Sequence, residues 1–189
     1  MLWRLLQEDN IKIYKLHYLF ELMKERRVLK KGKVVVTQKG EVVIHLANKI
    51  VKSIKPLCSR IEIVGSIRRK EKNPVDIDIV LIPKNREKLE EFMKKKWKYL
   101  QGGEKKSNWK IEGVKVELYY TNKEEWGAEL LAYSSEFGAG IGLRMVAKRK
   151  GMKLSQHGLF SRKGRRIAGR SEEQIYHSLG RPWKKPENR

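Results

Sequence analysis

The sequence predicts an α/β (α+β) fold, in which a mixed or antiparallel sheet is backed by helices and followed by a small lobe of helices and a hairpin. Strand-like runs gather between residues 60 and 120, and one amphipathic helical stretch interrupts them. The last third alternates helical patterns with short strands at glycine-containing turns. The 189 residues are enough for one compact domain or two small lobes with a real core.

The first forty residues are predicted to form a helical extension. Apolar residues at near-helical spacing favour a helix over residues 1–30. Two short apolar runs, Val34–Val36 and Val42–Ile44, predict a hairpin, although residues 41–54 could equally form one helix that ends before Pro56.

The middle of the chain is predicted to form the sheet. A strand over residues 60–64 runs into a Gly-Ser turn, and residues 75–82 form the strongest strand pattern. An amphipathic helix is expected over residues 89–100. Residues 109–111 and 114–120 flank a Glu-Gly pair and predict a hairpin.

The final third is predicted to hold three helices and a small set of strands. Helices are expected at about 124–136 and 140–149, and short strands between residues 152 and 168. A capping-box pattern at residues 171–174 opens the last helix, which Gly180 ends.

The charge of the chain predicts a polyanionic partner. Lys and Arg total 44 against 22 Asp and Glu, a formal net charge of +22, and so large a surplus favours nucleic acid over a merely solvated surface. Because Cys58 is the single cysteine of the sequence, an internal disulfide is excluded, and this favours a reducing compartment. No apolar run has the length of a membrane span. We expect a monomer inside the cell (cytoplasm, nucleus or virus-associated) with no membrane partner.

Three acids on two strands predict a metal site. In a strand alternate side chains share a face, so Asp76 and Asp78 point the same way while the apolar residues between them face a core. Glu117 is an acid on a second, otherwise apolar strand, where it shares a face with Lys115 and Tyr119. If the two strands are neighbours, three hard oxygen donors meet on one face, a set that suits Mg²⁺. Two ions there would activate a 3′ hydroxyl and stabilise a leaving pyrophosphate.

The turn before the first acid predicts a triphosphate site. Gly65 allows close backbone approach, Ser66 offers a hydroxyl, and Arg69 brings a charged fork. An exposed strand with alternating acids is the alternative for the Asp-x-Asp pattern alone. The Gly-Ser-x-Arg-Arg run ahead of it and the acid-bearing strand behind it favour the catalytic interpretation.

Together these motifs resemble a known enzyme family. The run Gly65-Ser-Ile-Arg-Arg69 followed by Asp76-Ile-Asp78 resembles the nucleotidyltransferase signature of the X-family DNA polymerases. Leu143-Arg144 with the later His157-Gly-Leu-Phe160 resembles the family's thumb, and Ser171–Tyr176 resembles its closing helix. The resemblance covers roughly residues 45–189, and its thumb blocks are the more specific part. It implies a palm over residues 41–121 and a thumb over residues 122–189, after the extension of residues 1–40.

The resemblance also implies residue roles. Asp76 and Asp78 would bind both metal ions and Glu117 the catalytic one, with two Mg²⁺ as cofactors and Mn²⁺ able to substitute. The nucleotide would be bound by Gly65, Ser66, Arg69, Tyr133 and Ser134. Arg144 would face the template strand, and further DNA contacts fall to the basic residues of the thumb: Lys148, Arg149, Lys150, Arg162, Lys163, Arg165 and Arg166. The partners would be gapped or primer-template DNA and deoxynucleoside triphosphates.

Some residues depart from the family pattern. The third carboxylate is usually Asp, whereas here it is Glu117, and the usual Thr-Gly after the aromatic is replaced by Ser134-Ser135. The family's N-terminal lyase domain has no counterpart pattern in residues 1–40, so we expect no lyase activity. The four histidines show no metal-ligand spacing, and His157 is interpreted as a structural turn residue.

The function predicted from the sequence is DNA-directed DNA polymerisation by two-metal nucleotidyl transfer, in short-gap repair. Two alternatives remain: a template-independent terminal transferase or RNA nucleotidyltransferase, and a non-catalytic DNA-binding module that keeps the palm shape.

Overall fold

The computed structural model describes residues 26–30, 33–37 and 40–189, and its N-terminal described element is a hairpin. Strand β1 (Arg26–Lys30) pairs antiparallel with β2 (Lys33–Thr37). The predicted helix over residues 1–30 is therefore wrong at 26–30, and the rest of it lies outside the described residues. The valines of β2 favour the extended backbone and find hydrogen-bonding partners in β1.

Helix α2 (Gly40–Ile54) follows the hairpin and decides between two sequence predictions. Val42–Ile44 lie in this helix, so their predicted pairing with Val34–Val36 is wrong and the single-helix alternative is confirmed. Buried residues at helical spacing, from Val43 to Ile54, give α2 one apolar face. The helix ends at Ile54 and is followed by a short 3-10 turn, η1 (Lys55–Leu57), which contains Pro56.

The five-stranded sheet is mixed, which confirms the predicted fold class. Its spatial order is β3 (Cys58–Ile63), β4 (Asp76–Pro83), β7 (Val114–Tyr120), β6 (Lys106–Ile111) and β5 (Lys98–Gly102). Strands β4 and β7 run parallel, and the other neighbours run antiparallel. The two central strands are the ones that carry the predicted acids.

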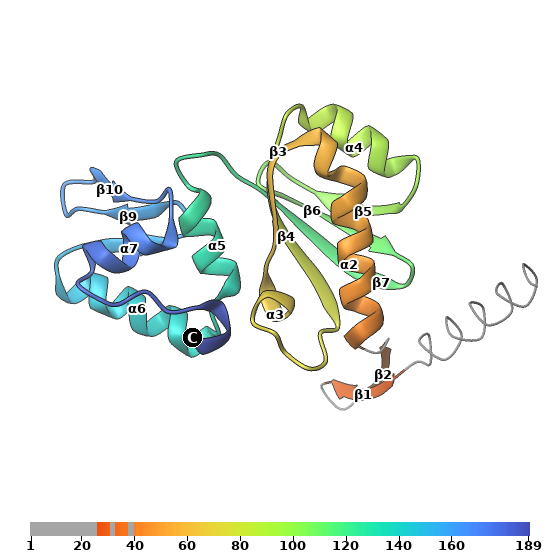
Figure 1. The fold of residues 1–189 in the computed structure, drawn as a ribbon, viewed down its shortest axis with the longest axis horizontal. Helices are drawn as coiled ribbons and strands as arrows, with labels where there is room; N and C mark the ends of the chain where they lie inside the picture. Colours follow the sequence, from red (N-terminus) through yellow and green to blue (C-terminus); the bar gives the residue numbers. More distant parts are fainter. Residues whose placement is uncertain (1–25, 31–32, 38–39) are drawn as a thin grey trace, which may run out of the picture.

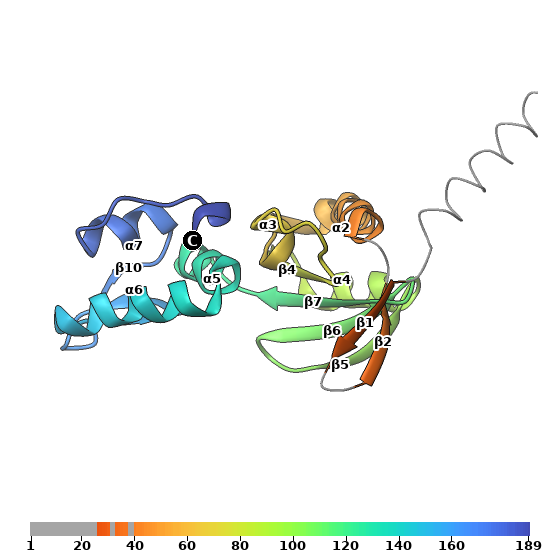
Figure 2. The ribbon, with the colours of Figure 1, turned by 90° about the horizontal axis from the view of Figure 1, so that it is seen from below.

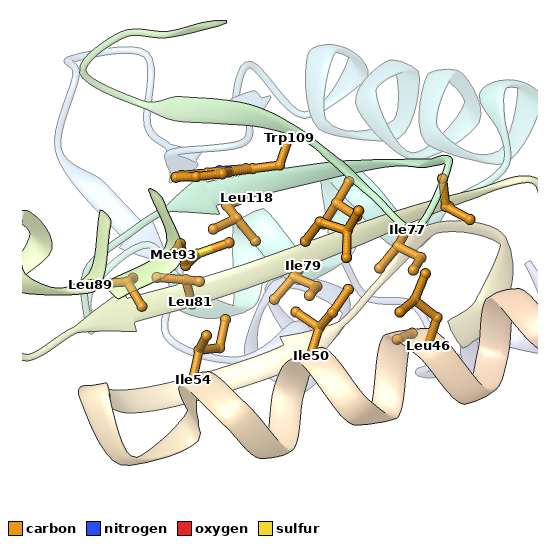
Figure 3. Packing of buried hydrophobic residues seen from close by; sticks show 14 of the residues in the cluster. Leu46, Ile50, Ile54, Ile77, Ile79, Leu81, Leu89, Met93, Trp109 and Leu118 are labelled. Atoms are coloured by element: carbon orange, nitrogen blue, oxygen red, sulfur yellow. The ribbon is translucent and has the colours of Figure 1, made fainter. Parts of the chain in front are cut away.

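One face of this sheet is covered by α2 and by α4 (Arg86–Lys94) (Figure 1). Ile50 of α2, Ile79 of β4 and Leu118 of β7 are fully buried in this layer, and Figure 3 shows them side by side. Trp109 of β6 joins them with no exposed surface. Alternate residues of β4 and β7 therefore face this core, and the residues between them face the opposite side of the sheet.

The predicted helix over residues 89–100 is too long. Helix α4 ends at Lys94, and β5 begins at Lys98 and pairs with the edge of β6. Lys95, Lys96 and Trp97 separate the two elements. Leu100, which completes the apolar helical pattern in the sequence, has 46% of its surface exposed on β5. The apolar helical pattern of the sequence continues past Lys94, but pairing with β6 decides the structure of this segment.

The predicted β6–β7 hairpin is confirmed. Its two turn residues, Glu112 and Gly113, both have positive φ, at 48° and 84°. A two-residue loop with two positive φ values matches the right-handed twist of the strands it joins. This turn sets the register that places Asn108 opposite Glu117.

The C-terminal lobe follows the predicted order of helices and strands. Its elements are α5 (Trp126–Ser134), α6 (Phe137–Arg149), β8 (Lys153–Ser155), β9 (Gly158–Phe160), β10 (Arg166–Ala168), α7 (Glu172–Ser178) and the 3-10 turn η2 (Pro186–Asn188). The three short strands form one sheet in the order β10-β9-β8. The predicted cap of α7 is present, because the Ser171 hydroxyl accepts a hydrogen bond from the Gln174 amide at 3.2 Å.

A hydrophobic cluster joins this lobe to the sheet. Figure 2 shows β7 pointing towards α5, and Tyr119 near the end of β7 packs with Trp126 and Leu130 of α5. Val64 and Val80 complete the cluster from the sheet side. The face of the sheet opposite α2 therefore carries acids towards one end and the contact with α5 towards the other.

Across the described ranges, none of the helices is both long enough and apolar enough to cross a bilayer.

Candidate active site

The three predicted acids lie on one face of two neighbouring strands. The parallel register of β4 and β7 sets Asp78 directly beside Glu117 and Asp76 beside Lys115. Ile77, between the two aspartates, is fully buried on the other face of the sheet. The strand geometry expected from the sequence is therefore present, and the role of the acids as metal ligands remains a prediction.

Tyr119 connects two of these acids and was not foreseen from the sequence. Its hydroxyl lies 3.3 Å from Asp78 Oδ1 and 3.0 Å from Glu117 Oε2. Burial and the two neighbouring carboxylates raise the pKa of Tyr119 far above its ordinary value, so the phenol stays protonated and donates. Tyr119 shares a strand face with Glu117 because the two are two residues apart.

The surroundings shift the pKa values of Asp78 and Glu117 in opposite directions. Burial, together with the charges of Asp76 and Glu117, raises the pKa of Asp78 to about 6. Burial also opposes ionisation of Glu117, but hydrogen bonds from Lys106, Lys115 and Tyr119 outweigh it and hold the pKa of Glu117 below its ordinary value. The repulsion at Asp78 is the kind of interaction that a bound cation relieves.

Two lysines contact Glu117. Lys106 and Lys115 place their ammonium groups 3.0 and 3.2 Å from Glu117 Oε1. In the described part of the chain, the acid trio is not among the groups whose ligand atoms all lie within 4.8 Å of one another. Both lysine side chains are about half exposed, at 48% and 54%, so they can turn into solvent when a cation replaces them.

The predicted triphosphate turn packs against Asp78. Gly65 begins a single helical turn, α3 (Gly65–Arg68), with φ at +65°. A Cβ at this position would lie 2.2 Å from Asp78 Oδ2, so only glycine fits without moving the acid. Ser66 follows and is half-buried. The backbone of the turn therefore lies directly against one of the three acids.

The two arginines after this turn have different surroundings. Arg69, the predicted triphosphate ligand, places Nε 2.9 Å and Nη2 2.5 Å from Glu71 Oε1. Arg68 forms a two-pronged pair with Glu172 of α7, at 2.8 and 2.9 Å, and donates to Ser134 Oγ at 2.9 Å. Arg189 also reaches Glu172, at 2.7 Å. This buried network links α3 to the C-terminal lobe.

The other two predicted nucleotide-binding residues, Tyr133 and Ser134, lie on α5. Tyr133 is half-buried and stacks on Tyr119, with ring centroids 3.7 Å apart and planes inclined by 22°. Burial raises the pKa of Tyr133 to about 12. Ser134 has no exposed surface, and its hydroxyl faces Arg68. The stack of Tyr133 on Tyr119 brings the C-terminal lobe next to the acids.

The predicted DNA-binding residues lie on the surface of the C-terminal lobe. They belong to the second half of α6 and its end, to the segment between β9 and β10, and to the first residue of β10. All of them are exposed: Arg144, Lys148, Arg149, Lys150, Arg162, Lys163, Arg165 and Arg166. Arg166 differs from the others because its Nη2 lies 3.2 Å from Glu125 Oε1.

A second group of acids, which the sequence analysis did not single out, lies at the start of α5. Glu125, Glu129 and His157 place their ligand atoms within 4.8 Å of one another. Burial raises the pKa of Glu129 to about 7. Burial opposes ionisation of Glu125 as well, but a hydrogen bond with His157 outweighs it and lowers the pKa of Glu125. The four-residue spacing of the two glutamates was a visible signal, whereas His157 is distant in sequence.

Comparisons with known proteins match this arrangement. Residues 140–189 match the family model of the DNA polymerase beta thumb. The chain is also 26% identical, over 147 residues, to the repair DNA polymerase X of African swine fever virus (isolate Warthog/Namibia/Wart80/1980), an alignment that covers 72% of this chain and 84% of that protein. The matched thumb, the mixed sheet and the Gly-Ser and Asp-x-Asp motifs side by side support an X-family DNA polymerase.

Proposed function

We propose that the chain is a DNA-directed DNA polymerase that adds deoxynucleotides to a DNA 3′ end during short-gap repair. The observation that carries the proposal is the pairing of Asp78 with Glu117 across β4 and β7, directly against the glycine turn at Gly65. Such a site places acids for metal ions next to backbone that can approach phosphate. The repair polymerase of the virus supports the role in repair.

The donor set of the site fits divalent metal ions. Asp76, Asp78 and Glu117 offer hard carboxylate oxygens, which Mg²⁺ prefers. Two bound ions would activate the primer hydroxyl and stabilise the leaving pyrophosphate. The chain itself holds the acids on rigid strands, and Lys106 and Lys115 neutralise Glu117 until a cation replaces them.

The nucleotide and DNA would be bound on either side of these acids. Gly65, Ser66 and Arg69 would contact the triphosphate, and Arg69 would exchange Glu71 for phosphate. Tyr133 and the Ser134 segment would lie along the sugar, beside Tyr119. The exposed basic residues of the thumb would contact DNA phosphates and account for part of the net charge of +22.

The predicted division into palm, residues 41–121, and thumb, residues 122–189, is part of this proposal. The largest hydrophobic cluster draws its buried residues from Val43 to Tyr120, and a second cluster draws its buried residues from Ala128 to Leu179. Two separate cores with a small shared cluster support two lobes that move as units.

Primer extension on gapped DNA, with and without a template strand, tests the proposal. We expect Asp76→Ala, Asp78→Ala and Glu117→Ala each to abolish incorporation while DNA binding largely survives, because binding depends on the basic surface. Glu91→Ala, which removes an exposed acid on α4, is the matched control and should extend normally. Extension without template would favour terminal transfer, and wild-type protein that binds DNA without extending it would favour the non-catalytic alternative.

Glu117 allows a finer test of the third ligand. Glu is one methylene longer than Asp, so we expect a looser site in which Mn²⁺ supports faster extension than Mg²⁺, because Mg²⁺ demands near-ideal octahedral geometry. Glu117→Asp should keep measurable activity. Glu117→Gln keeps the shape and loses the charge, and we expect it to be nearly inactive. Wild-type activity in Glu117→Gln would exclude Glu117 as a ligand.

A further inference from the structure

A buried carboxylate without a hydrogen-bond partner lies in the thumb, outside the candidate active site. Glu129 of α5 has only 4% of its surface exposed. Across the described ranges its Oε2 atom is buried and accepts no hydrogen bond. Leaving such an acceptor unpaired is unfavourable, and more so when the group is charged. Its position therefore points to a ligand that would satisfy it.

Two other ligating side chains surround this carboxylate. Glu125 lies four residues earlier, at the N-terminal cap of α5, so both glutamates project from the same side of the helix. His157 comes from the turn between β8 and β9, and its Nδ1 atom lies 3.0 Å from Glu125 Oε2. Figure 1 shows α5 beside β9, with which it packs. All three groups can direct one ligand atom to a common point, since these atoms lie within 4.8 Å of one another.

The backbone holds His157 in this position. The Ser155 hydroxyl accepts a hydrogen bond from the His157 amide at 3.2 Å. The next residue, Gly158, has φ at +135°, and a Cβ there would lie 2.8 Å from the carbonyl oxygen of Ala168. Contacts with β8 and β10 therefore hold the turn in place, so the backbone that carries the His157 imidazole has little conformational freedom.

We propose that Glu125, Glu129 and His157 form a second metal site that binds one divalent transition-metal ion, Zn²⁺ in particular. One imidazole nitrogen with two carboxylate oxygens is a donor set that Zn²⁺ accepts, and the imidazole disfavours Mg²⁺. The site is separate from the acids of β4 and β7, and it depends on neither their role nor the polymerase activity.

The neighbouring charges leave room for a cation. Arg166 contacts Glu125 through Oε1, whereas His157 contacts it through Oε2, the oxygen that an ion would take. The bound ion would replace the proton that now lies between His157 and Glu125. It would also supply the missing partner of Glu129. The consequence is a cross-link between α5 and the β8–β9 hairpin, which precedes the exposed basic segment at residues 162–166.

Titration of the metal-free full chain with Zn²⁺, followed by calorimetry and native mass spectrometry, tests the site. We expect one ion whose affinity falls at least about tenfold in Glu129→Gln and in His157→Gln. His177→Gln, an exposed histidine of α7, is the matched control and should bind Zn²⁺ as the wild type does. Asp78→Asn removes a palm acid and should also retain this ion. An excess of Mg²⁺ should not displace it.

Equal Zn²⁺ binding by the wild type, Glu129→Gln and His157→Gln would overturn the proposal, as would loss of the ion in Asp78→Asn alone or failure of the wild type to bind one. Circular dichroism checks that each variant is folded. The His157 side chain is 39% exposed, so His157→Gln should fold. This variant therefore still tests the site if Glu129→Gln does not fold. Because the readout is metal binding, an inactive polymerase with an intact Zn²⁺ site would refute only the proposed function.

Discussion

Replacing Glu172 with Gln should destabilise the protein by about 3–5 kcal/mol. Glu172 is 4% exposed, and its partners Arg68 and Arg189 are 16% and 1% exposed. Removing the acid would leave the buried Arg189 guanidinium without its acidic partner and Arg68 with only Glu62, whose Oε1 lies 3.9 Å away. Breaking one side of a buried ion pair typically costs that amount. Arg189 already has one buried nitrogen, Nη2, without a partner among the described residues. Its Nε donates to the Lys184 carbonyl at 2.9 Å, an acceptor that carries no charge. A loss of this size is a large share of the 5–15 kcal/mol that stabilises a typical domain.

Urea denaturation followed by circular dichroism at pH 7 measures this difference. The matched control is Glu173→Gln, which removes the same charge from the next residue of α7, where the side chain is exposed. We expect the control to stay within about 0.5 kcal/mol of the wild type. A Glu172→Gln protein within about 1 kcal/mol of the wild type would refute the reasoning, because the network would then contribute no more than a surface pair.

The pH dependence of the same difference provides a second check. Burial opposes ionisation of Glu172, but Arg68 and Arg189 outweigh it and hold its pKa below the ordinary 4.5. The stabilisation by this acid is therefore complete above pH 4.5 and is lost as the pH falls through the lowered value. The gap between wild type and Glu172→Gln should be constant from pH 6 to 7 and should shrink below about pH 4.

Three further outcomes are expected. Gly65→Ala should reduce nucleotide incorporation by at least about 100-fold, because the new Cβ displaces Asp78. It should also destabilise the fold by about 1–2 kcal/mol, because the backbone has φ at +65°. Its control is Gly138→Ala, at a helical position where a Cβ would meet nothing within 4 Å, and this change should be neutral or stabilising. DNA affinity, measured by fluorescence anisotropy, should fall with salt along a log–log slope of about −4 to −7, from roughly four to eight phosphate contacts. In chelated, metal-free protein, Glu129→Gln should be more stable than the wild type above pH 7 by up to about 3 kcal/mol, because the wild type must ionise a buried acid whose pKa is raised from 4.5 to about 7.

Each of these outcomes has a contrary result. Near-normal extension by Gly65→Ala would mean that the glycine turn does not position Asp78. A salt slope near zero would count against the basic thumb as the DNA surface. The stability advantage of Glu129→Gln should vanish below pH 4.5, where both states of the wild type are protonated, and an advantage that is independent of pH would point to packing and not to charge.

The acids of the palm were predictable because their signal is local. Alternation along β4 assigns Asp76 and Asp78 to one face, and alternation along β7 assigns Glu117 to the face opposite its apolar neighbours, whatever the rest of the chain does. That all three acids share a face follows once the two strands are neighbours. The apolar residues between them make the opposite face a core, so the register follows from burial. The glycine turn was equally local, since its spacing to the first acid is read directly from the chain.

Features that depend on tertiary pairing could not be predicted in this way. Leu100 completes a helical pattern but lies on β5, because pairing with β6 decides that segment. Tyr119 gained its role from lying between Asp78 and Glu117, which requires the parallel register of β4 and β7. Arg68 and Glu172 are 104 residues apart, and nothing in the local sequence of either identifies the partner.

The stacked pair of Tyr119 and Tyr133 gives the two lobes a mechanical connection through aromatic rings. The hydroxyl of Tyr119 reaches Asp78 and Glu117, while its ring face rests on a residue of α5. A rotation of α5 that slides Tyr133 off this ring removes the support that keeps the Tyr119 hydroxyl between the acids. Such a rotation would change one hydrogen-bond donor at the acids, without any residue of α5 having to contact a carboxylate.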